Sequence, residues 1–434
     1  MADAEAEVEA DRFSSLPFKI KICILAHLKI KDAVRTSALA RSWRNLWTHL
    51  PCLNLCNRRD RLRGKWTQRA YHLVSSLQGP LHYFQLDYYR QNPVPHEDSV
   101  LLQSLLDLLP QKGGVEKLDL IFDTKPLEKI CLPSFHSLYV LNLSGCHVVL
   151  PTGFQGFRRL KTLSMHSVGI CNDELNLLVR TSKNLTSLVI SKCHSWANPL
   201  SVELSLPFLR HLEFYIIYQN SFEKALVVSA PCLKQAVIGL KHFRSQNSAQ
   251  MMLRLVTSVT TAYSLKLSFD VLRCFSLVAL PFNFTFPCLR CLTFPLNMDA
   301  NKQMCDVFLW LLRSMPFLEE LQAKSQSFYD YQAERVTILM KDLLVKKHDG
   351  FACLEGTLTS VTIYTYCMDV NNSIAIIQFF LLNAKVLKLL KIHTSASVVQ
   401  SMIEELQKAE VTSSHAKVMI SDDMSNEYYL YDWN

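Results

Sequence analysis

The sequence predicts an α/β protein in which a small N-terminal domain of three helices precedes a long solenoid with a curved parallel sheet. Three observations support this prediction. Residues 11–55 place apolar side chains at helical spacing in three short runs. From residue 81 onward, a leucine pattern recurs every 22 to 25 residues in its clearest copies, which is typical of stacked repeats. The length of 434 residues also favours two parts over one compact core.

Within residues 11–55, Ser15 is expected to cap the first helix, whose first turn tolerates Pro17. Asp32 is expected to help cap the second helix, and Pro51 to end the third. Each helix carries an apolar stripe: Ile20, Ile24 and Leu28; then Val34, Ala38 and Leu39; then Trp43, Leu46, Trp47 and Leu50. Three short helices cannot bury all of these side chains among themselves. Part of the apolar surface must therefore contact the rest of the chain or another protein.

The same segment resembles the F-box of plant proteins through its DR-x-S-x-LP opening, its KDAVRTS-x-L run and its SWRNLW end. The resemblance implies a domain that docks on a Skp-type adaptor and, through it, on a cullin. It implies adaptor contacts by Leu16, Pro17, Ile20, Ile24, Leu28, Val34, Trp43 and Trp47. The chain has Lys19 and Lys21 where the family commonly has an acidic and an aliphatic residue, so the first helix is unusually basic. A helical cap on the following domain is the alternative.

The pattern L-x-x-L-x-L predicts one strand per repeat between residues 81 and 325. Its copies start at Leu81, Val115, Leu138, Leu160, Leu185, Leu209, Leu233, Ala262, Leu289 and Leu318. No single repeat can bury its apolar side, so neighbouring repeats must stack into a leucine-rich-repeat solenoid, assigned to residues 81–350. Cys146 and Cys193 follow the last leucine of their copies by three residues, where a side chain packs inside the turn. We expect both cysteines to be structural.

Apolar residues at every third or fourth position predict helices on the convex side of the solenoid. These helices are expected at Asp98–Leu109, Asn172–Ser182, Ala300–Met315 and Glu334–His348.

Residues 351–425 resemble the FBD region that follows leucine-rich repeats in many plant F-box proteins. The resemblance rests on L-x-x-V-x-I from Leu358 to Ile363 and on the run FFLLNAKVLKLLKI. The pattern predicts a strand, a helix at Ser373–Asn383, a strand at Leu387–Ile392 and a helix at Ala396–Ala409. This region would close the solenoid. The order of the parts resembles the F-box/leucine-rich-repeat/FBD family of plants.

Three shorter segments complete the domain organisation. Residues 1–10 are acidic and predicted to be disordered, and residues 56–80 form a linker with a basic helical segment. Residues 426–434 form a polar and aromatic tail to which no role can be assigned.

Patterns that carry catalytic chemistry are weak in this sequence. Glycine occurs only 11 times and never as G-x-G, which disfavours a phosphate-binding loop. Cys288 and Cys291 have metal-ligand spacing but lack a second pair, and His96–Glu97 lacks the second histidine of a zinc motif. We therefore predict no catalytic residue, metal or cofactor.

Fourteen cysteines without regular pairing favour a reducing compartment, so we expect the protein in the nucleus and/or cytoplasm. The sequence contains no uncharged apolar stretch of about twenty residues, so no membrane-spanning helix is predicted.

The family resemblance implies the substrate receptor of a cullin-based ubiquitin ligase, which holds a target protein near the reacting centre and performs no bond chemistry itself. Target contact is expected on the concave face, where side chains alternate with the buried leucines. The candidates are His166, His211, Glu213, Tyr215, Lys266, Gln322 and Lys324. The identity of the target, and any need for a small-molecule ligand, are left open by the sequence.

The net charge of +8 raises the question of nucleic acid, but the basic residues are dispersed. The densest cluster, Arg58 to Lys65, fits a solvated linker, so the sequence disfavours nucleic-acid binding. Two alternative functions stay open: a repeat scaffold whose F-box has drifted, and a receptor for a small molecule or nucleic acid.

Overall fold

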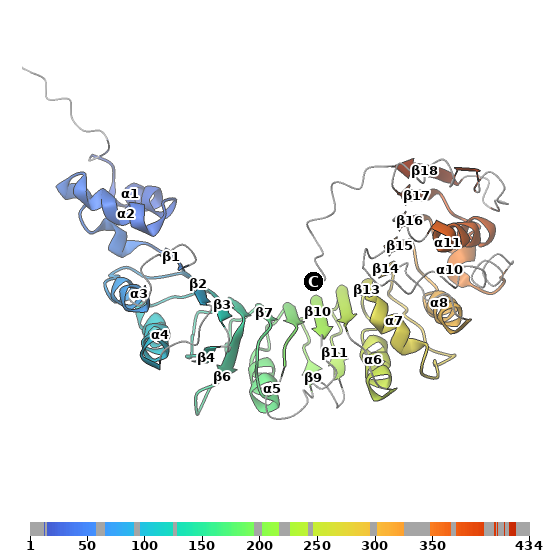
Figure 1. The fold of residues 1–434 in the computed structure, drawn as a ribbon, viewed down its shortest axis with the longest axis horizontal. Coiled ribbons are helices and arrows are strands. Elements are labelled where there is room, and N and C mark those ends of the chain that lie inside the picture. Colours follow the sequence, from blue (N-terminus) through green and yellow to red (C-terminus); the bar gives the residue numbers. More distant parts are fainter. Residues whose placement is uncertain are drawn as a thin grey trace, which may run out of the picture. The chain divides into compact units, whose positions relative to one another are not determined.

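The computed structural model describes residues 13, 15–57, 66–90, 96–124, 128–194, 202–216, 226–241, 246–295, 302–324, 348–365, 370–394, 403–404, 406, 412 and 416–421 (Figure 1). The chain divides into two compact units. The first comprises residues 1–185 with 193–196, and the second comprises residues 186–192 with 197–434.

The first unit begins with a helical domain of residues 15–51, here called the N-terminal helical domain. It contains α1 (Phe18–Ala26), α2 (Ile30–Arg35) and three 3₁₀ turns, η1 (Thr36–Ala38), η2 (Arg41–Trp43) and η3 (Leu46–His49). Its small core consists of Leu25, Ala33, Trp43, Leu46 and Leu50. Ile24 and Trp47 pack against this core from the side.

Local chemistry in this domain differs from the sequence prediction at three points. Pro17 itself is the N-cap of α1, and Ser15 lies before it without capping the helix. Asp32 lies inside the first turn of α2, where it pairs with Arg35 at 3.3 Å, and Lys29 takes the cap position. The predicted third helix is interrupted, because Asn45 adopts a left-handed conformation with φ of 63° between η2 and η3.

The sheet of the first unit is parallel, in the order β1 (Cys52–Cys56), β2 (Tyr83–Arg90), β3 (Lys117–Thr124), β5 (Val140–Ser144) and β7 (Thr162–His166). A small second sheet pairs β4 (Glu128–Cys131) with β6 (Cys146–Val149). The helical elements are α3 (Trp66–Ser75), α4 (His96–Leu108), η4 (Leu109–Lys112) and α5 (Asn172–Thr181). Figure 1 shows these helices on one side of the sheet.

Strand β1 was not predicted from the sequence, although Leu50, Leu53 and Leu55 repeat the same leucine pattern. β1 pairs with β2 in parallel register from Cys52 with Tyr83 to Cys56 with Asp87. Leu53 and Leu55 are buried in the sheet core, while Leu50 is buried in the core of the helical domain. The first repeat strand therefore follows the helical domain directly.

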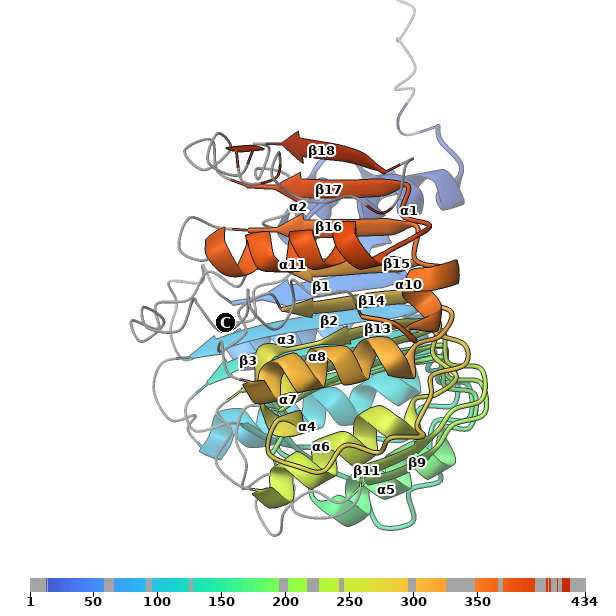
Figure 2. The same cartoon turned by 90° about the vertical axis from the view of Figure 1, so that its right-hand side faces the viewer.

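The sheet of the second unit is also parallel throughout. Its order is β8 (Ser187–Ser191), β10 (His211–Ile216), β12 (Gln235–Leu240), β13 (Ser264–Leu267), β14 (Cys291–Pro295), β15 (Glu320–Lys324), β16 (Ser360–Tyr364), β17 (Leu389–His393) and β18 (Lys417–Ser421). A two-stranded sheet pairs β9 (Val202–Ser205) with β11 (Leu226–Ser229). The helices are α6 (Gln246–Ser258), α7 (Phe269–Phe275), α8 (Lys302–Ser314), α10 (Ala352–Gly356) and α11 (Val370–Asn383). Figure 2 shows α8 and α11 covering one face of the later strands.

The leucine pattern is confirmed as the core of both sheets. Every pattern residue of the ten predicted copies is at most 2% exposed. The same period continues into β16 and β17, where Leu358, Val361, Ile363, Leu387, Leu390 and Ile392 are fully buried. Because side chains alternate across a strand, the residues between them are left for the opposite face of each sheet.

The predicted helices are confirmed where the structure describes them, as α4 with η4, α5, α8 and α11. The predictions at Glu334–His348 and Ala396–Ala409 fall almost wholly outside the described residues, as do residues 1–10 and 426–434. Of the cysteines that the structure describes, all thirteen carry free thiols, and Cys146 and Cys193 are buried as expected. Among the described helices none is long and apolar enough to cross a membrane.

Candidate functional site

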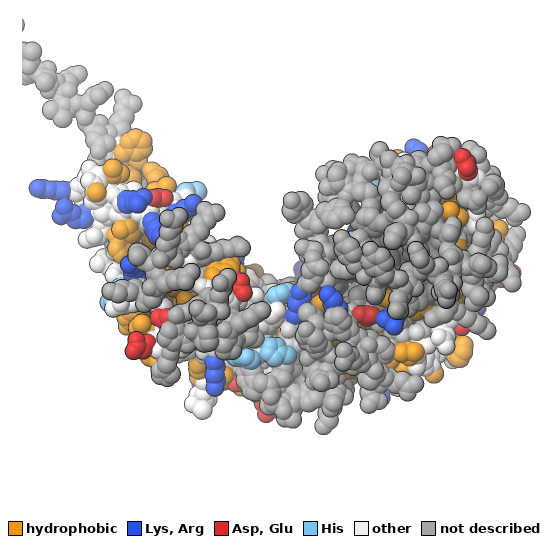
Figure 3. Space-filling model, viewed as in Figure 1, with side chains coloured by type: hydrophobic (Ala, Val, Ile, Leu, Met, Phe, Trp, Pro, Cys, Tyr) orange, Lys and Arg blue, Asp and Glu red, His pale blue; other side chains and the backbone are white. Residues whose placement is uncertain are grey.

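Large apolar side chains are exposed on the N-terminal helical domain although its core is closed. They are Phe18, Ile20, Leu28, Val34 and Leu39, together with Phe13 just before the domain. In Figure 3, hydrophobic and basic side chains are interspersed over α1 and α2. Several large apolar side chains exposed on one small domain are typical of a protein interface. We call these six residues the docking surface.

Eight residues were predicted from the sequence to contact the adaptor, and their exposure in the structure differs. Ile20, Leu28 and Val34 are exposed, as is Pro17, and Leu16 is half-buried. Ile24 and Trp47 pack partly against the core.

Trp43 is only 5% exposed and belongs to the core, so it supports the docking surface from beneath instead of offering its ring to a partner. Phe13, Phe18 and Leu39 were missed. Phe13 and Leu39 lie within the quoted motifs, and Leu39 is part of the predicted apolar stripe of the second helix, but none of the three was predicted to contact the adaptor.

Lys21 also differs from expectation, because its side chain is buried within the domain. Its ammonium group lies 5.7 Å from the centre of the Trp43 ring, which is a cation–π distance. Lys19, two residues earlier, is exposed. Of the two lysines that depart from the family pattern, only Lys19 therefore adds charge to the exposed surface of α1.

A second candidate surface is the exposed face of the sheet in the first unit, where polar side chains of adjacent strands are hydrogen-bonded in one row. Asn54 Nδ2 donates to Gln85 Oε1 at 2.8 Å, and Gln85 Nε2 donates to Asp87 Oδ1 at 3.0 Å. The parallel register brings Asn54, Gln85, Asp119 and Asn142 side by side.

Asp119 is the centre of this row and is almost fully buried. It accepts from the Tyr83 hydroxyl at 2.8 Å and from Asn142 Nδ2 at 2.6 Å, and it pairs with Lys117 at 3.2 Å. Burial raises the pKa of Tyr83, and the hydrogen bond to Asp119 raises it further, so the hydroxyl stays a donor. Sequence patterns gave no sign of this network, since its members are spread over residues 54 to 142.

His166, the one predicted target residue in the first unit, is exposed at the end of β7. In the second unit, Glu213, Lys266 and Gln322 fall in one register row on the half-exposed face, with Val237 and Thr293 between them. His211 Nδ1 lies 3.2 Å from Gln235 Oε1.

Lys324 lies over the Tyr364 ring, and the distance between its ammonium nitrogen and the ring centre is 4.6 Å. The Tyr364 ring in turn stacks on His393 at 4.6 Å. Tyr215 is the exception among the predicted target residues. It is buried, and burial together with Asp270 raises its pKa to about 12, so it is a core residue.

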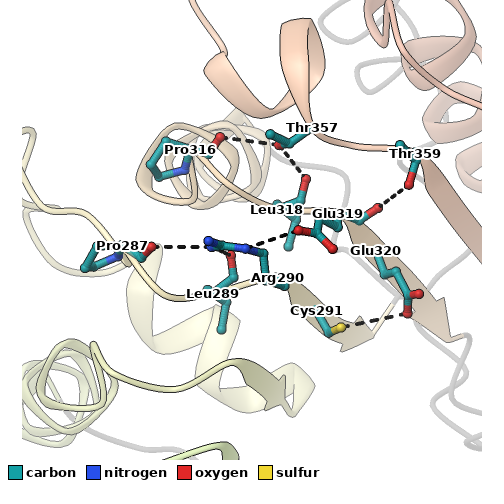
Figure 4. A network of polar contacts seen from close by, with 10 residues as sticks. All are labelled: Pro287, Leu289, Arg290, Cys291, Pro316, Leu318, Glu319, Glu320, Thr357 and Thr359. Atoms are coloured by element: carbon teal, nitrogen blue, oxygen red, sulfur yellow. Dashed lines mark hydrogen bonds and ion pairs between the residues drawn. The ribbon is translucent and has the colours of Figure 1, made fainter. Parts of the chain in front are cut away.

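The C-x-x-C pair lies at the start of β14, beside a polar network drawn in Figure 4. Cys291 Sγ donates to Glu320 Oε2 at 3.8 Å, and Arg290 pairs with Glu319 at 3.2 Å. Burial and Glu320 raise the pKa of Cys291 to about 11, so its thiol is protonated at neutral pH. A protonated thiol is a poor nucleophile and metal ligand. Within the described ranges, no group of three or more His, Cys, Asp or Glu side chains could hold a metal ion.

These features define a class of protein, a repeat protein with an N-terminal docking domain. An F-box domain model matches residues 13–55, and the model "FBD-associated F-box protein At5g56370, LRR repeats" matches residues 102–323. The chain belongs to the F-box/FBD/LRR-repeat family of plant proteins.

Among Arabidopsis thaliana relatives, the chain is 28% identical over 231 residues to "F-box/FBD/LRR-repeat protein At1g13570". That match covers 50% of this chain and 53% of the relative, so it spans about half of the relative's length. A match to "F-box protein At1g60400" is 53% identical over 45 residues, 10% of this chain and 11% of the relative. A match to "F-box/LRR-repeat protein At2g42720" is 23% identical and covers 94% of this chain and 99% of the relative. The two domains and these relatives support an F-box substrate-adaptor role.

Proposed function

We propose that this protein is the substrate-recognition subunit of a Skp–cullin–F-box ubiquitin ligase. The observation that carries the proposal is the docking surface, which exposes Phe18, Ile20, Leu28 and Leu39 around a core that is already closed. Covering one large apolar side chain stabilises a complex by about 1.5–3 kcal/mol. A Skp-type adaptor that buried several of them would be held firmly, and a cullin would be recruited through it.

In this proposal the repeats capture a target protein, and catalysis is by proximity. The receptor raises the effective concentration of a target lysine near the charged ubiquitin-conjugating enzyme, so it needs no catalytic residue of its own. A target can contact two surfaces of the repeats. One is the polar row of Asn54, Gln85, Asp119 and Asn142 in the first unit, and the other is the row of Glu213, Lys266 and Gln322 in the second unit. We place this activity in the nucleus and/or cytoplasm, where ubiquitin ligases of this kind work and thiols stay reduced.

The test is co-purification of the full chain with a plant Skp-type adaptor. Leu28→Asp should abolish the complex, because it replaces an exposed apolar side chain of the docking surface with a charge. Leu177→Asp is the matched control, since Leu177 on α5 is 39% exposed and Leu28 is 41% exposed. Retention of the adaptor by Leu28→Asp, or equal loss in both variants, would contradict the proposal. Deleting residues 1–55 is a poorer test because it also removes β1 from the sheet.

A second candidate function, a repeat scaffold without ligase activity, is favoured by the exposed Lys19 on α1. The native chain would then fail to hold the adaptor, and Lys19→Glu would restore binding. Lys21→Leu would not restore it, because Lys21 lies in the core.

A further inference from the structure

Three lysines lie on or directly before the last two described strands of the second unit, β17 and β18. Lys391 lies on the half-exposed face of β17, in register with Met419 of β18. Lys417 begins β18, and its backbone N–H donates to the carbonyl oxygen of Lys388 at 2.9 Å. Lys417 is in register with Leu389, and side chains two residues apart on a strand share a face, so Lys391 and Lys417 lie on one face of the sheet. Lys388 lies one residue before β17.

None of these three lysines has an ion-pair partner among the described residues. The contrast is Lys385, which pairs with Glu355 at 3.5 Å. Lys388 and Lys417 are exposed, and Lys391 is half-exposed. The area therefore carries positive charge that the rest of the described chain does not neutralise.

Strand β18 is the last strand of the sheet order and pairs only with β17 among the described strands. Val418 is 41% exposed and Met419 is 45% exposed. Leu390 and Val361, which are in register with Val418 on the preceding strands, are fully buried. One more strand beside β18 would bury Val418 in the same way.

Among the described strands, none pairs with the outer side of β18. The N–H of Lys417 faces β17, and N–H groups of a strand alternate in direction, so the N–H of Val418 faces away from the sheet. An edge strand with unpaired N–H and C=O groups is a template for an incoming strand. We call Lys388, Lys391, Lys417, Val418 and Met419 the edge patch.

We propose that the edge patch captures an extended, acidic segment of the target protein, which adds as a strand beside β18. Main-chain hydrogen bonds would hold the segment, and its acidic side chains would pair with the three lysines. The proposal rests on the proposed function, because the target is the protein that the repeats recruit.

Two other occupants fit less well. A second copy of the same edge would bring like charges together, which is how lysines protect edge strands from self-association. Single-stranded nucleic acid needs a free aromatic ring on which bases can stack. The Tyr364 ring on β16 lies between Lys324 on β15 and His393 on β17, and both contact it.

The test uses the full chain bound to its Skp-type adaptor and three fluorescent probes. These are a 12-residue peptide alternating Glu and Val, the same peptide with Lys for Glu, and a 12-nucleotide single-stranded DNA. Binding is measured by fluorescence anisotropy for the native chain and for the triple variant Lys388→Gln, Lys391→Gln, Lys417→Gln. The matched control is Lys129→Gln, Arg158→Gln, Lys183→Gln, which removes the same charge from exposed positions in the first unit.

The native chain should bind the Glu peptide in preference to the Lys peptide. The triple variant should bind it at least about fivefold more weakly, as expected for three exposed ion pairs. The control should stay within about twofold of the native chain. Equal weakening in variant and control would overturn the proposal, because the binding would then follow net charge alone. Tighter binding of DNA than of the Glu peptide would overturn it in favour of nucleic acid.

Strand addition has its own test in Val418→Pro, which removes the outward N–H but leaves the bonds to β17. Proline is tolerated at an edge strand on its solvent side. The variant should keep the adaptor and the native melting temperature and lose Glu-peptide binding by about fivefold or more, the scale of one buried hydrogen bond. Unchanged peptide affinity would exclude strand addition. Loss of the adaptor in the native chain would instead refute the proposed function, so the two failures are distinguishable.

Discussion

At the scale of single residues, the charge of Lys21 is accommodated inside the N-terminal helical domain. Its ammonium group lies over the Trp43 ring, and its stem lies along the apolar core. From the sequence, Trp43 was predicted to contact the adaptor, and Lys21 was predicted to make the first helix unusually basic. Burial shows instead that they contact each other. Motif membership alone therefore does not separate a surface residue from a residue that supports it.

Lys21→Ala should destabilise the chain by about 1–2 kcal/mol, through loss of the cation–π contact and of the packed stem. Lys19→Ala, at an exposed position of the same helix, should change the unfolding free energy by less than about 0.5 kcal/mol. Thermal unfolding of both variants, without adaptor, checks the difference. Equal melting temperatures would show that the buried position of Lys21 contributes nothing.

At the scale of elements, the turn after β5 requires glycine for two separate reasons. Gly145 has a φ of 68°, and a β-carbon there would overlap the carbonyl oxygen of Phe122. Gly153 has a similar φ of 79° but open space around it. The pair therefore separates backbone strain from steric overlap.

Gly153→Ala should cost about 1–2 kcal/mol, which is the strain of a left-handed alanine. Gly145→Ala should cost at least about 2 kcal/mol more, because the backbone of β3 must move. Chemical denaturation measures both values. Similar losses in the two variants would mean that the strand relaxes around the added carbon.

The neighbouring histidines His147 and His194 form another element-scale feature, since their rings are 5.4 Å apart. Burial lowers the pKa of both, and the charges of His194 and Lys129 lower that of His147 further. In the unfolded chain both imidazoles become protonated near the ordinary histidine pKa of 6.5, whereas in the folded chain they become protonated only at lower pH.

Stability should therefore be constant above about pH 6.5 and should fall as the pH decreases below it. The melting temperature followed from pH 7.5 to 5 measures this dependence. A double variant, His147→Gln with His194→Gln, should flatten the curve, while the exposed His136→Gln should not. An unchanged slope in the double variant would assign the acid sensitivity to other groups.

At the scale of the whole molecule, the repeat strands could be predicted almost completely from the sequence. One leucine pattern recurs with the period of a stacked fold, and its burial in every copy follows from that stacking. The polar row around Asp119 could not be predicted, because parallel pairing joins residues that are 23 to 36 positions apart. Strand β1 was not predicted, because its leucines fall within residues 11–55, which were assigned to the helical domain.

The position of β1 predicts where the chain can be shortened. A chain that begins at residue 51 keeps β1 and should remain soluble and monomeric. A chain that begins at residue 57 exposes the buried side of β2 and should melt at a lower temperature and aggregate. Size-exclusion chromatography and thermal unfolding of the two chains check this, and identical behaviour would show that β1 is dispensable.

The strict register of the second sheet has a consequence for how such a protein can diversify. Paired positions at the strand starts are 24 residues apart from His211 to Gln235, 27 from Ser264 to Cys291 and 40 from Glu320 to Ser360. The connecting segments thus vary widely in length while the strands keep one alignment. Insertions and deletions in the loops of these segments, outside helices such as α8 whose Phe308 and Leu311 are buried, should be nearly neutral for folding, since loop closure costs rise only slowly with length. New binding specificities could therefore arise in these segments during evolution without redesign of the core.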